Sequence, residues 1–353
     1  MCSADLIWDW KPVVQDELFA RAFHTCNAVD GKLLIYGGVK SANAKEMPLS
    51  DTVFFNPLTR SIESLSPAET RAVPRSHHDA VVIKDRWLCA VGGWDGHKRV
   101  SSVRCFDAES KQWTDLAEGP SSDPPVGLSS HSCTRISDHE LCVVGREGGL
   151  RMQRRYGSVY TLRINIITNS FWYREATTRT ASRAGHTAML LPDSGKDGKG
   201  TSYKLLIVGG REGTETDIAG RWSAEKLQIE TPHAPKLTEK LSQLIEGCAP
   251  STAPKNVRHQ SCSVVGPFAV FCGGEHLGKT RDIICNDLYV LDTRSGSGIW
   301  YHFPCSNPEK KRAGHRTCLL DDHLYLVGGL GPDGKTPSAE ICELAIQLSS
   351  AVG

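Results

Sequence analysis

The sequence predicts an all-β protein in which one four-stranded unit is repeated six times, and three observations lead to this prediction. An apolar run that ends in Gly-Gly recurs along the chain. A polar motif precedes each run, and a third apolar run followed by a Trp-bearing fourth run comes after most of them. Repeats of this length with four short strands are typical of the blades of a β-propeller. We therefore expect one six-bladed propeller with antiparallel blades.

The apolar run before the two glycines is the second strand of each unit. It occupies residues 33–38, 88–93, 205–210, 270–274 and 324–329. A sixth copy at 141–146 has Arg146 in place of the second glycine. Two glycines at a strand end predict a backbone with positive φ, or one that passes close to a neighbouring strand. Arg146 therefore predicts either local strain or a tolerated substitution.

The polar motif fixes the register of the repeat. Five copies carry a histidine and one carries a glutamine, at His24, His78, His131, His186, Gln260 and His315. Successive positions are separated by 54 residues (24 to 78), 53 (78 to 131), 55 (131 to 186), 74 (186 to 260) and 55 (260 to 315). One equivalent side chain per unit predicts a structural hydrogen-bonding role. A metal site is less well supported, because six spread positions without a nearby carboxylate or thiolate do not form a usual ligand set.

These signals divide the chain into six units and one separate strand. The predicted blades span residues 21–66, 75–117, 129–175, 183–257, 258–304 and 312–345. The sixth unit lacks a Trp-bearing strand of its own, whereas residues 6–12 near the N-terminus form an unattached one. We expect this strand to complete the sixth blade and close the ring, because an open ring would expose two sheet faces.

The fourth unit is longer than the others and departs from the pattern. A loop rich in Gly, Ser and charge separates its first two strands, and its third and fourth strands are hard to recognise. An insertion at 231–256 instead places Leu237, Leu241, Leu244 and Ile245 at helical spacing. We expect a short amphipathic helix on the outside of the ring, within blade four. It either covers a weak blade edge or docks a partner.

Composition limits the classes of function. The 13 cysteines contain no C-x-x-C pair and lie mostly in strand-like runs, which indicates reduced thiols and not a disulfide framework or a zinc finger. The net charge of +1 gives no general attraction to nucleic acid or to an anionic membrane. No apolar run reaches the roughly 18 residues of a membrane span, and the N-terminus does not read as a signal peptide. We expect an intracellular monomer, in the cytoplasm or the nucleus, without a cofactor.

The Gly-Gly strand, the Tyr-bearing third strand and the spaced Trp resemble the kelch repeat, and the resemblance runs from residue 6 to residue 344. It implies a six-bladed propeller that binds other proteins through the loops at one end of its channel. Resemblance to one member of the family also suggests a cyclin as a partner. The propeller uses the whole chain, so no BTB or BACK domain is expected. A role as substrate receptor of a cullin-type ubiquitin ligase is an alternative, although residues 244–248 match an elongin-binding box only in part.

An arginine cluster in the third unit is the candidate binding site. It lies in the loop expected after the second strand and consists of Arg146, Arg151, Arg154 and Arg155. Matching loops of other units add Trp94, Arg99, Arg211, His276, Lys279 and Arg281. Arg and Trp are frequent interface hot spots, and Arg pairs well with carboxylates, so these loops predict a site for an acidic peptide or a protein partner. The other interpretation is a solvated basic loop that nearby glutamates partly neutralise.

A second set of arginines stands just before the repeat positions, at Arg21, Arg75, Arg183, Arg258 and Arg312. In related propellers such arginines grip acidic peptides or chain-end carboxylates. They could equally form salt bridges or backbone contacts between blades.

A metal-dependent enzyme is the second alternative function, since some kelch propellers hold copper or iron. The sequence offers no converging set of ligands for it, and no G-x-S-x-G, H-E-x-x-H or P-loop motif. We therefore favour a non-enzymatic interaction module, such as an adaptor or scaffold. Nucleic acid is not an expected partner, because the loops offer no stacking platform.

Overall fold

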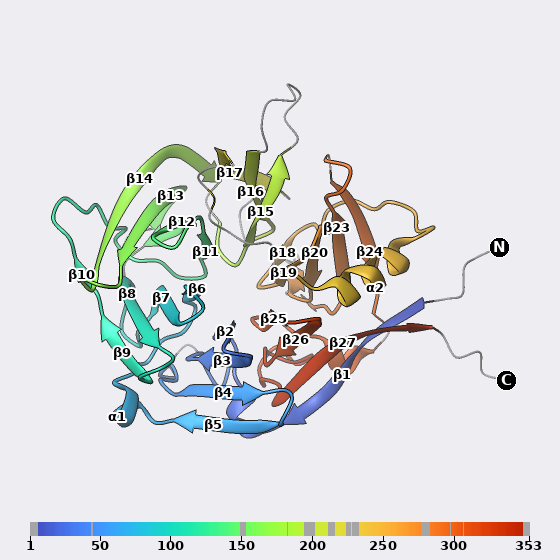
Figure 1. The fold of residues 1–353 in the computed structure, drawn as a ribbon, viewed down its shortest axis with the longest axis horizontal. Coiled ribbons are helices and arrows are strands. Elements are labelled where there is room, and N and C mark those ends of the chain that lie inside the picture. Colours follow the sequence, from blue (N-terminus) through green and yellow to red (C-terminus); the bar gives the residue numbers. More distant parts are fainter. Residues whose placement is uncertain are drawn as a thin grey trace.

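Sheets of mainly antiparallel strands stand around a central axis (Figure 1). The computed structural model describes residues 6–43, 45–148, 153–181, 183–193, 202–210, 216–223, 227, 233–276, 283–296, 298–305 and 307–348. Within these residues the innermost strands contact one another in a closed cycle: β2 (Thr25–Val29), β6 (Asp79–Ile83), β11 (Ser132–Arg135), β15 (Thr187–Asp193), β19 (Ser261–Val265), β25 (Arg316–Leu320) and again β2. The fold is the β-propeller that the sequence predicts.

Three blades have the expected four strands in consecutive order. The first adds β3 (Lys32–Tyr36), β4 (Thr52–Asn56) and β5 (Ser61–Leu65) to β2; the second adds β7 (Trp87–Trp94), β8 (Arg99–Asp107) and β9 (Gln112–Asp115) to β6; the fifth adds β20 (Phe268–Cys272), β23 (Leu288–Asp292) and β24 (Ile299–Phe303) to β19. The inner strands are buried on both faces, as in β3, where Leu33 to Tyr36 are all buried. Both faces of a blade pack against neighbouring blades, so these strands read as continuous apolar runs.

The third blade is extended at its outer side. It contains β12 (Glu140–Gly148), β13 (Gln153–Asn165) and β14 (Ser170–Ala181), and β10 (Ala117–Glu118) adds a short parallel strand to β14. β14 continues six residues past the predicted end of the blade at 175. This blade therefore projects further than its neighbours.

The fourth blade has a third strand that sequence reasoning did not recognise. It is β17 (Thr216–Ser223), which pairs with β16 (Ser202–Val208) through a register shift at Leu205/Leu206. Its sequence lacks the apolar alternation of the other third strands, because only Ala219 among its residues is buried. Within the described residues this blade has three strands.

The N-terminal strand completes the last blade. β1 (Leu6–Gln15) pairs antiparallel with β27 (Glu340–Leu348), which is followed inward by β26 (His323–Val327) and β25. β1 is three residues longer than the predicted strand at 6–12. β1 begins and β27 ends side by side at the edge of the ring, with Leu6 opposite Leu348 (Figure 1).

The predicted helix is present, but it does not pack on the fourth blade. α2 (Pro235–Ile245) buries its apolar face in the cluster that joins the fifth and last blades, where it meets Trp10 of β1 and Phe268 of β20. Its first turn is capped by Asp322, in the β25–β26 turn, which accepts a hydrogen bond from the Lys236 N–H at 2.8 Å. The helix is inserted in the sequence of the fourth unit, as predicted, and its apolar stripe packs on a seam one blade further on. Of the two roles considered for the helix, the structure supports edge covering.

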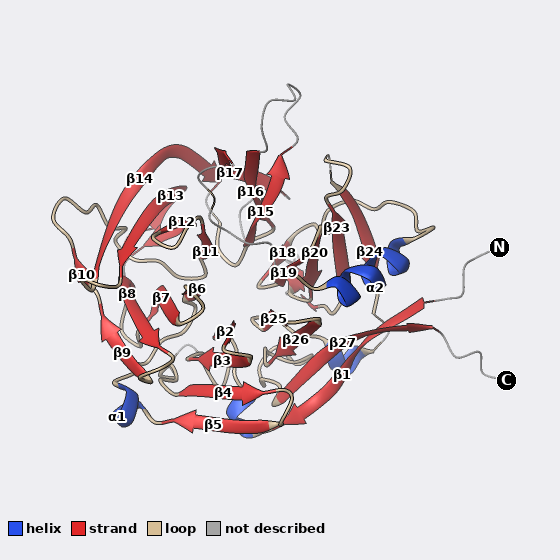
Figure 2. Ribbon diagram, in the orientation of Figure 1, coloured by secondary structure: helices blue, strands red, loops and turns tan. Residues whose placement is uncertain are grey.

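The remaining helical elements are short and peripheral (Figure 2). Among the described residues they are α1 (Pro67–Thr70), η1 (Glu17–Phe19) and η3 (Pro308–Lys310). No helix among the described residues is both long and apolar enough to span a bilayer. A small sheet of β18 (Val257–Arg258), β21 (Glu275–His276) and β22 (Ile283–Ile284) lies beside the fifth blade.

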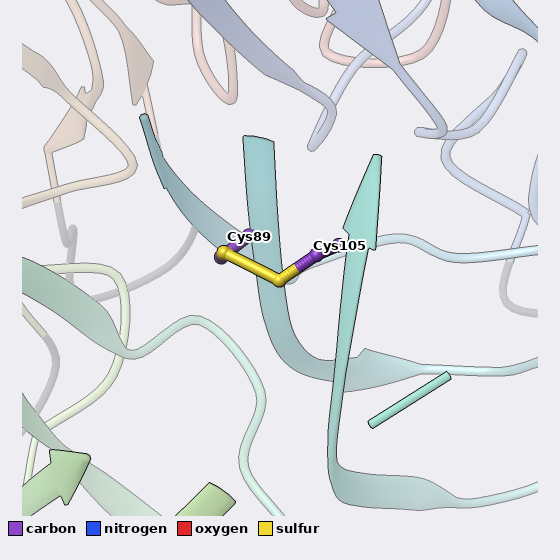
Figure 3. Close-up of a disulfide and its surroundings, with 2 residues drawn as sticks. All are labelled: Cys89 and Cys105. Carbon is purple, nitrogen blue, oxygen red and sulfur yellow. A yellow bond between two sulfur atoms is a disulfide. The ribbon is translucent and has the colours of Figure 1, made fainter. Parts of the chain in front are cut away.

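One pair of cysteines contradicts the expectation of reduced thiols. Cys89 of β7 and Cys105 of β8 form a disulfide (Figure 3). The two residues are directly opposite in the antiparallel pair, with Cα atoms 4.2 Å apart. A separation of 16 positions in the sequence does not reveal this pairing. The other ten cysteines of the described chain are free.

Candidate functional site

The six repeat positions form a buried ring around the channel. Three of the histidines bond a hydroxyl of the preceding blade through Nε2, in the pairs His78–Thr25 (3.1 Å), His186–Ser132 (2.9 Å) and His315–Ser261 (2.7 Å). Gln260 imitates them, since its Nε2 donates to the Thr187 hydroxyl at 3.2 Å. Each bond joins two adjacent blades. These contacts support a structural role for the ring.

Burial keeps the ring uncharged near neutral pH. It lowers the pKa of His131 to about 4 and the pKa of His186 and His315 to about 3. The pKa values of His24 and His78 are also well below normal, for the same reason. Among the described residues no group of three or more His, Cys, Asp or Glu side chains has an arrangement that could hold a metal ion.

The Gly-Gly pairs let the blades approach each other above this ring. Gly37 has φ +67°, and a Cβ atom there would lie 2.3 Å from the Arg75 carbonyl oxygen of the next blade. The third blade is the exception, because neither Gly145 nor Arg146 has positive φ and β12 stays paired with β13 through Arg146, after which the register shifts. The strain considered for Arg146 is therefore absent: an extended strand accepts any side chain.

The arginines before the repeat positions are structural. Arg21 donates to the Gly37 carbonyl at 3.0 Å and pairs with Asp51 at 2.5 Å. Arg183 makes the equivalent bond to the Gly209 carbonyl at 3.0 Å. Arg75 and Arg312 are buried as well, and Arg258 pairs with Glu275 at 2.9 Å. Of the two interpretations for this set, the internal contacts support the structural one.

A closed cycle of backbone hydrogen bonds forms one end of the channel, which we call the upper mouth. Its members are the residues just before the repeat positions: Phe23, His77, Ser130, Gly185, His259 and Gly314. Each N–H donates to the carbonyl of the member in the preceding blade, at 2.7–2.9 Å, and Phe23 closes the cycle on Gly314. All six have positive φ, from +53° to +74°. Sequence reasoning missed this cycle because the six side chains share no chemistry.

Three of these side chains form the floor of the upper mouth. Phe23 stacks on His77, with ring centroids 4.0 Å apart, and meets His259 edge-on at 5.0 Å. Desolvation lowers the pKa of His77 to about 3, so its ring is neutral. His259 is held by Glu275 through Nδ1 at 2.7 Å. The floor is therefore aromatic and half-buried.

The structure places three of the predicted binding residues at the rim of this floor. The Trp94 N–H donates to the Ser76 carbonyl at 2.7 Å, next to His77, and Trp94 pairs with Arg99 across β7 and β8. His276 pairs with Val257, two residues before His259. The rim also carries exposed apolar side chains at Met47 (48% exposed), Val126 (51%) and Ile283 (53%).

The arginine cluster lies largely on a strand hairpin. Arg146 is opposite Gly157, and Gly148 is opposite Gln153, so β12 and β13 extend beyond the level at which other blades turn at Gly-Gly. The backbones of Arg154 and Arg155 belong to β13. The sequence predicted a loop for this segment; the structure describes strand on both sides of it, and the connection between β12 and β13 at residues 149–152 lies outside the described residues. Arg151, Arg211, Lys279 and Arg281 lie outside the described residues.

The opposite end of the channel, the lower mouth, is different in kind. It opens into a cavity of about 820 Å³ that runs between the fourth and fifth blades. Most of its lining is apolar, including Val82, Leu190, Pro192 and Val264. Its arginines are internally paired, as Arg135 is with Asp138 at 2.5 Å.

Comparison with known proteins places this architecture in a family. The family model described as the KLHDC2/KLHL20/DRC7 Kelch-repeats domain matches residues 4–149. Kelch domain-containing protein 9 of Homo sapiens is 48% identical over 338 residues, which cover 96% of this chain and 95% of that protein. The chain belongs to the kelch domain-containing protein 9 family. The protein of that name from Mus musculus is 48% identical over 339 residues, with the same coverage.

More distant relatives share the repeat alone. An F-box/kelch-repeat protein of Arabidopsis thaliana is 24% identical over 216 residues, or 60% of this chain and 41% of that protein. Kelch repeats generally mediate protein–protein interaction and are typically non-enzymatic. This gives the broad class of function and leaves the partner to be found.

Proposed function

We propose that the chain is a non-enzymatic interaction module that binds an acidic peptide or a protein partner through its upper mouth. One observation carries the proposal: an aromatic floor, formed by Phe23, His77 and His259, lies within a rim that exposes apolar side chains and bears basic residues. Exposed apolar groups around a half-buried centre are typical of interaction sites.

The rim supplies the charge selectivity. The hairpin of β12 and β13 carries Arg146, Arg154 and Arg155 beyond the level of the other blades, and Arg99 lies beside Trp94. An acidic segment would meet these side chains while an apolar residue rests on the floor. The long-range attraction accelerates association, whereas the apolar contact supplies most of the affinity.

A cyclin partner and an adaptor or scaffold role belong to the same proposal, and the family resemblance is their support. The ubiquitin-ligase alternative gains nothing from the structure. Leu244 and Ile245, which would lead an elongin-binding box, are buried under the seam of the last two blades.

The test measures binding of two probes, acidic peptides with free or amidated C-termini and a panel of purified cyclins. In one variant Arg151, Arg154 and Arg155 become Ala, and in another Met47 and Ile283 become Asp. We expect either variant to weaken binding roughly 10- to 100-fold. The matched control changes Leu58 (88% exposed) and Ile167 (91% exposed) to Asp, because both lie in turns at the opposite end of the blades.

The control variant should bind as the wild type does. If it loses affinity while the two upper-mouth variants keep it, the partner uses the lower side and the proposal fails. Melting temperatures of all three variants establish that the fold is intact.

A further inference from the structure

We propose that an ion pair across the channel, between Asp79 and Arg316, locks the ring at the place where the chain closes on itself. The proposal begins from a departure in the repeat. The residue after each repeat position lines the channel, and in order these are Thr25, Asp79, Ser132, Thr187, Ser261 and Arg316. Four are hydroxyl residues, and the two exceptions are one acid and one base.

The four hydroxyl side chains make equivalent hydrogen bonds. Each bonds the repeat residue of the next blade, as Thr25 bonds His78 and Ser261 bonds His315. At the other two junctions the next repeat residues are His131, after Asp79, and His24, after Arg316. Neither imidazole meets a hydroxyl, and no other side chain of the described structure bonds His24 or His131. The hydrogen bond between a hydroxyl and the repeat residue is therefore missing at these two blade junctions.

The two exceptions meet each other instead. Arg316 Nη2 lies 3.1 Å from Asp79 Oδ1, so a residue of the last blade pairs with one of the second blade. Arg316 also donates to the His24 carbonyl at 3.0 Å and to the His78 carbonyl at 3.3 Å. The far oxygen of Asp79 accepts the Cys133 N–H at 2.7 Å. One pair therefore ties together the last, first, second and third blades.

This chain of contacts spans the seam of the ring. The last and first blades are joined on the outside by the pairing of β1 with β27 and at the upper mouth by the Phe23–Gly314 bond. The Arg316 guanidinium adds a third contact between the last and first blades, on the channel side, where four other junctions have a hydroxyl. Both side chains are mostly shielded, at 34% and 13% exposure. Removing either one leaves a charge without its partner.

The experiment compares three variants of the ion pair and one control variant by thermal melting and hydrogen exchange. We expect Arg316→Ala and Asp79→Ala each to lower the melting temperature by about 5 °C. We expect the double variant Asp79→Ser/Arg316→Thr to be more stable than either, because it gives all six junctions a hydroxyl. Ser132→Ala is the control, since it removes a channel contact away from the seam.

Hydrogen exchange separates a seam lock from general loosening. In the single variants β1 and β27 should exchange faster while β12 and β13 keep their protection, and Ser132→Ala should not show this difference. If the losses in melting temperature add in the double variant, or if exchange rises equally in all blades, the lock is refuted. Should an alanine variant fail to fold, Arg316→Lys and Asp79→Asn provide the same comparison with milder changes.

Discussion

The two mouths of the channel are built from the same six inner strands, yet they differ in almost every property. The upper mouth is held by backbone hydrogen bonds, positive-φ residues and a neutral histidine ring, and it is closed by a stacked aromatic group. The lower mouth has an apolar cavity of about 820 Å³ and no comparable network among the described residues. The difference teaches that the repeat specifies only one end of the blade.

The reason is the position of the repeat signal within each unit. The histidine and the Gly-Gly pair both lie at the upper end, because the first strand starts there and the second strand finishes there. The lower ends of the strands are free to vary in length and side chain. Under the proposed function, partner specificity comes from the rim loops, which differ among blades while the floor geometry repeats.

The largest expected loss of stability comes from substituting a glycine at the upper end of a blade. Gly37→Val should destabilise the protein by more than about 3 kcal/mol, because a β-branched residue there combines positive φ with a backbone clash. The clash is with the Arg75 carbonyl, 2.3 Å from the Cβ position. Chemical denaturation measures the loss. The control is Gly31→Val in the β2–β3 turn, which has positive φ (+66°) but nothing within 4 Å of the Cβ position, so it should cost less.

The next effect is a dependence of stability on pH that originates at the upper end. The folded pKa values of His77, His131, His186 and His315, at about 3 to 4, lie below the ordinary value of 6.5. Between these pKa values the unfolded chain binds more protons than the folded chain, so stability falls as pH drops below about 6.5. Each buried histidine contributes a loss on the order of 2 kcal/mol between pH 6.5 and pH 5. Melting temperatures across this range measure it.

Gln260, which stands in the ring where the other blades have a histidine, suggests a more specific test of this pH dependence. Gln260 already occupies one repeat position and bonds Thr187 as the histidines bond their hydroxyls. His315→Gln should keep the contact with Ser261 and remove one titrating group, so the melting temperature should depend less steeply on pH than in the wild type. An unchanged slope would mean that the pH dependence comes from elsewhere.

The same contrast explains what the sequence could predict. The repeated signals at 24, 78, 131, 186, 260 and 315 fixed the register, so the strands, the propeller and the role of the N-terminal strand followed from them. Features that depend on contacts between units did not follow. The sequence of 235–245 predicted a helix and its apolar face, but not the seam between blades on which that face packs. Nothing in the sequence indicated that Cys89 and Cys105 lie opposite each other.

For the candidate site, the sequence indicated individual residues but not the arrangement that they share. Trp94 and Arg99 were expected in one loop of the second unit, and the structure pairs them at the ends of β7 and β8. The floor was missed because Phe23, His77 and His259 look unrelated in sequence; a shared backbone conformation unites them. Only the constant offset of one residue from the repeat positions could have indicated it.

The smallest expected effect decides which mouth binds. Ile283→Thr at the upper rim and Val82→Thr at the lower mouth make similar chemical changes at accessible sites, and each should cost at most about 1 kcal/mol of stability. Only Ile283→Thr should weaken binding of an acidic peptide, by roughly 3- to 10-fold, because an apolar contact of the rim becomes partly polar. Titration calorimetry with one peptide and both variants measures the difference. Equal affinities for the two variants would remove the apolar rim from the binding site, and a loss confined to Val82→Thr would move the site to the lower cavity, where the repeat leaves the sequence free to vary.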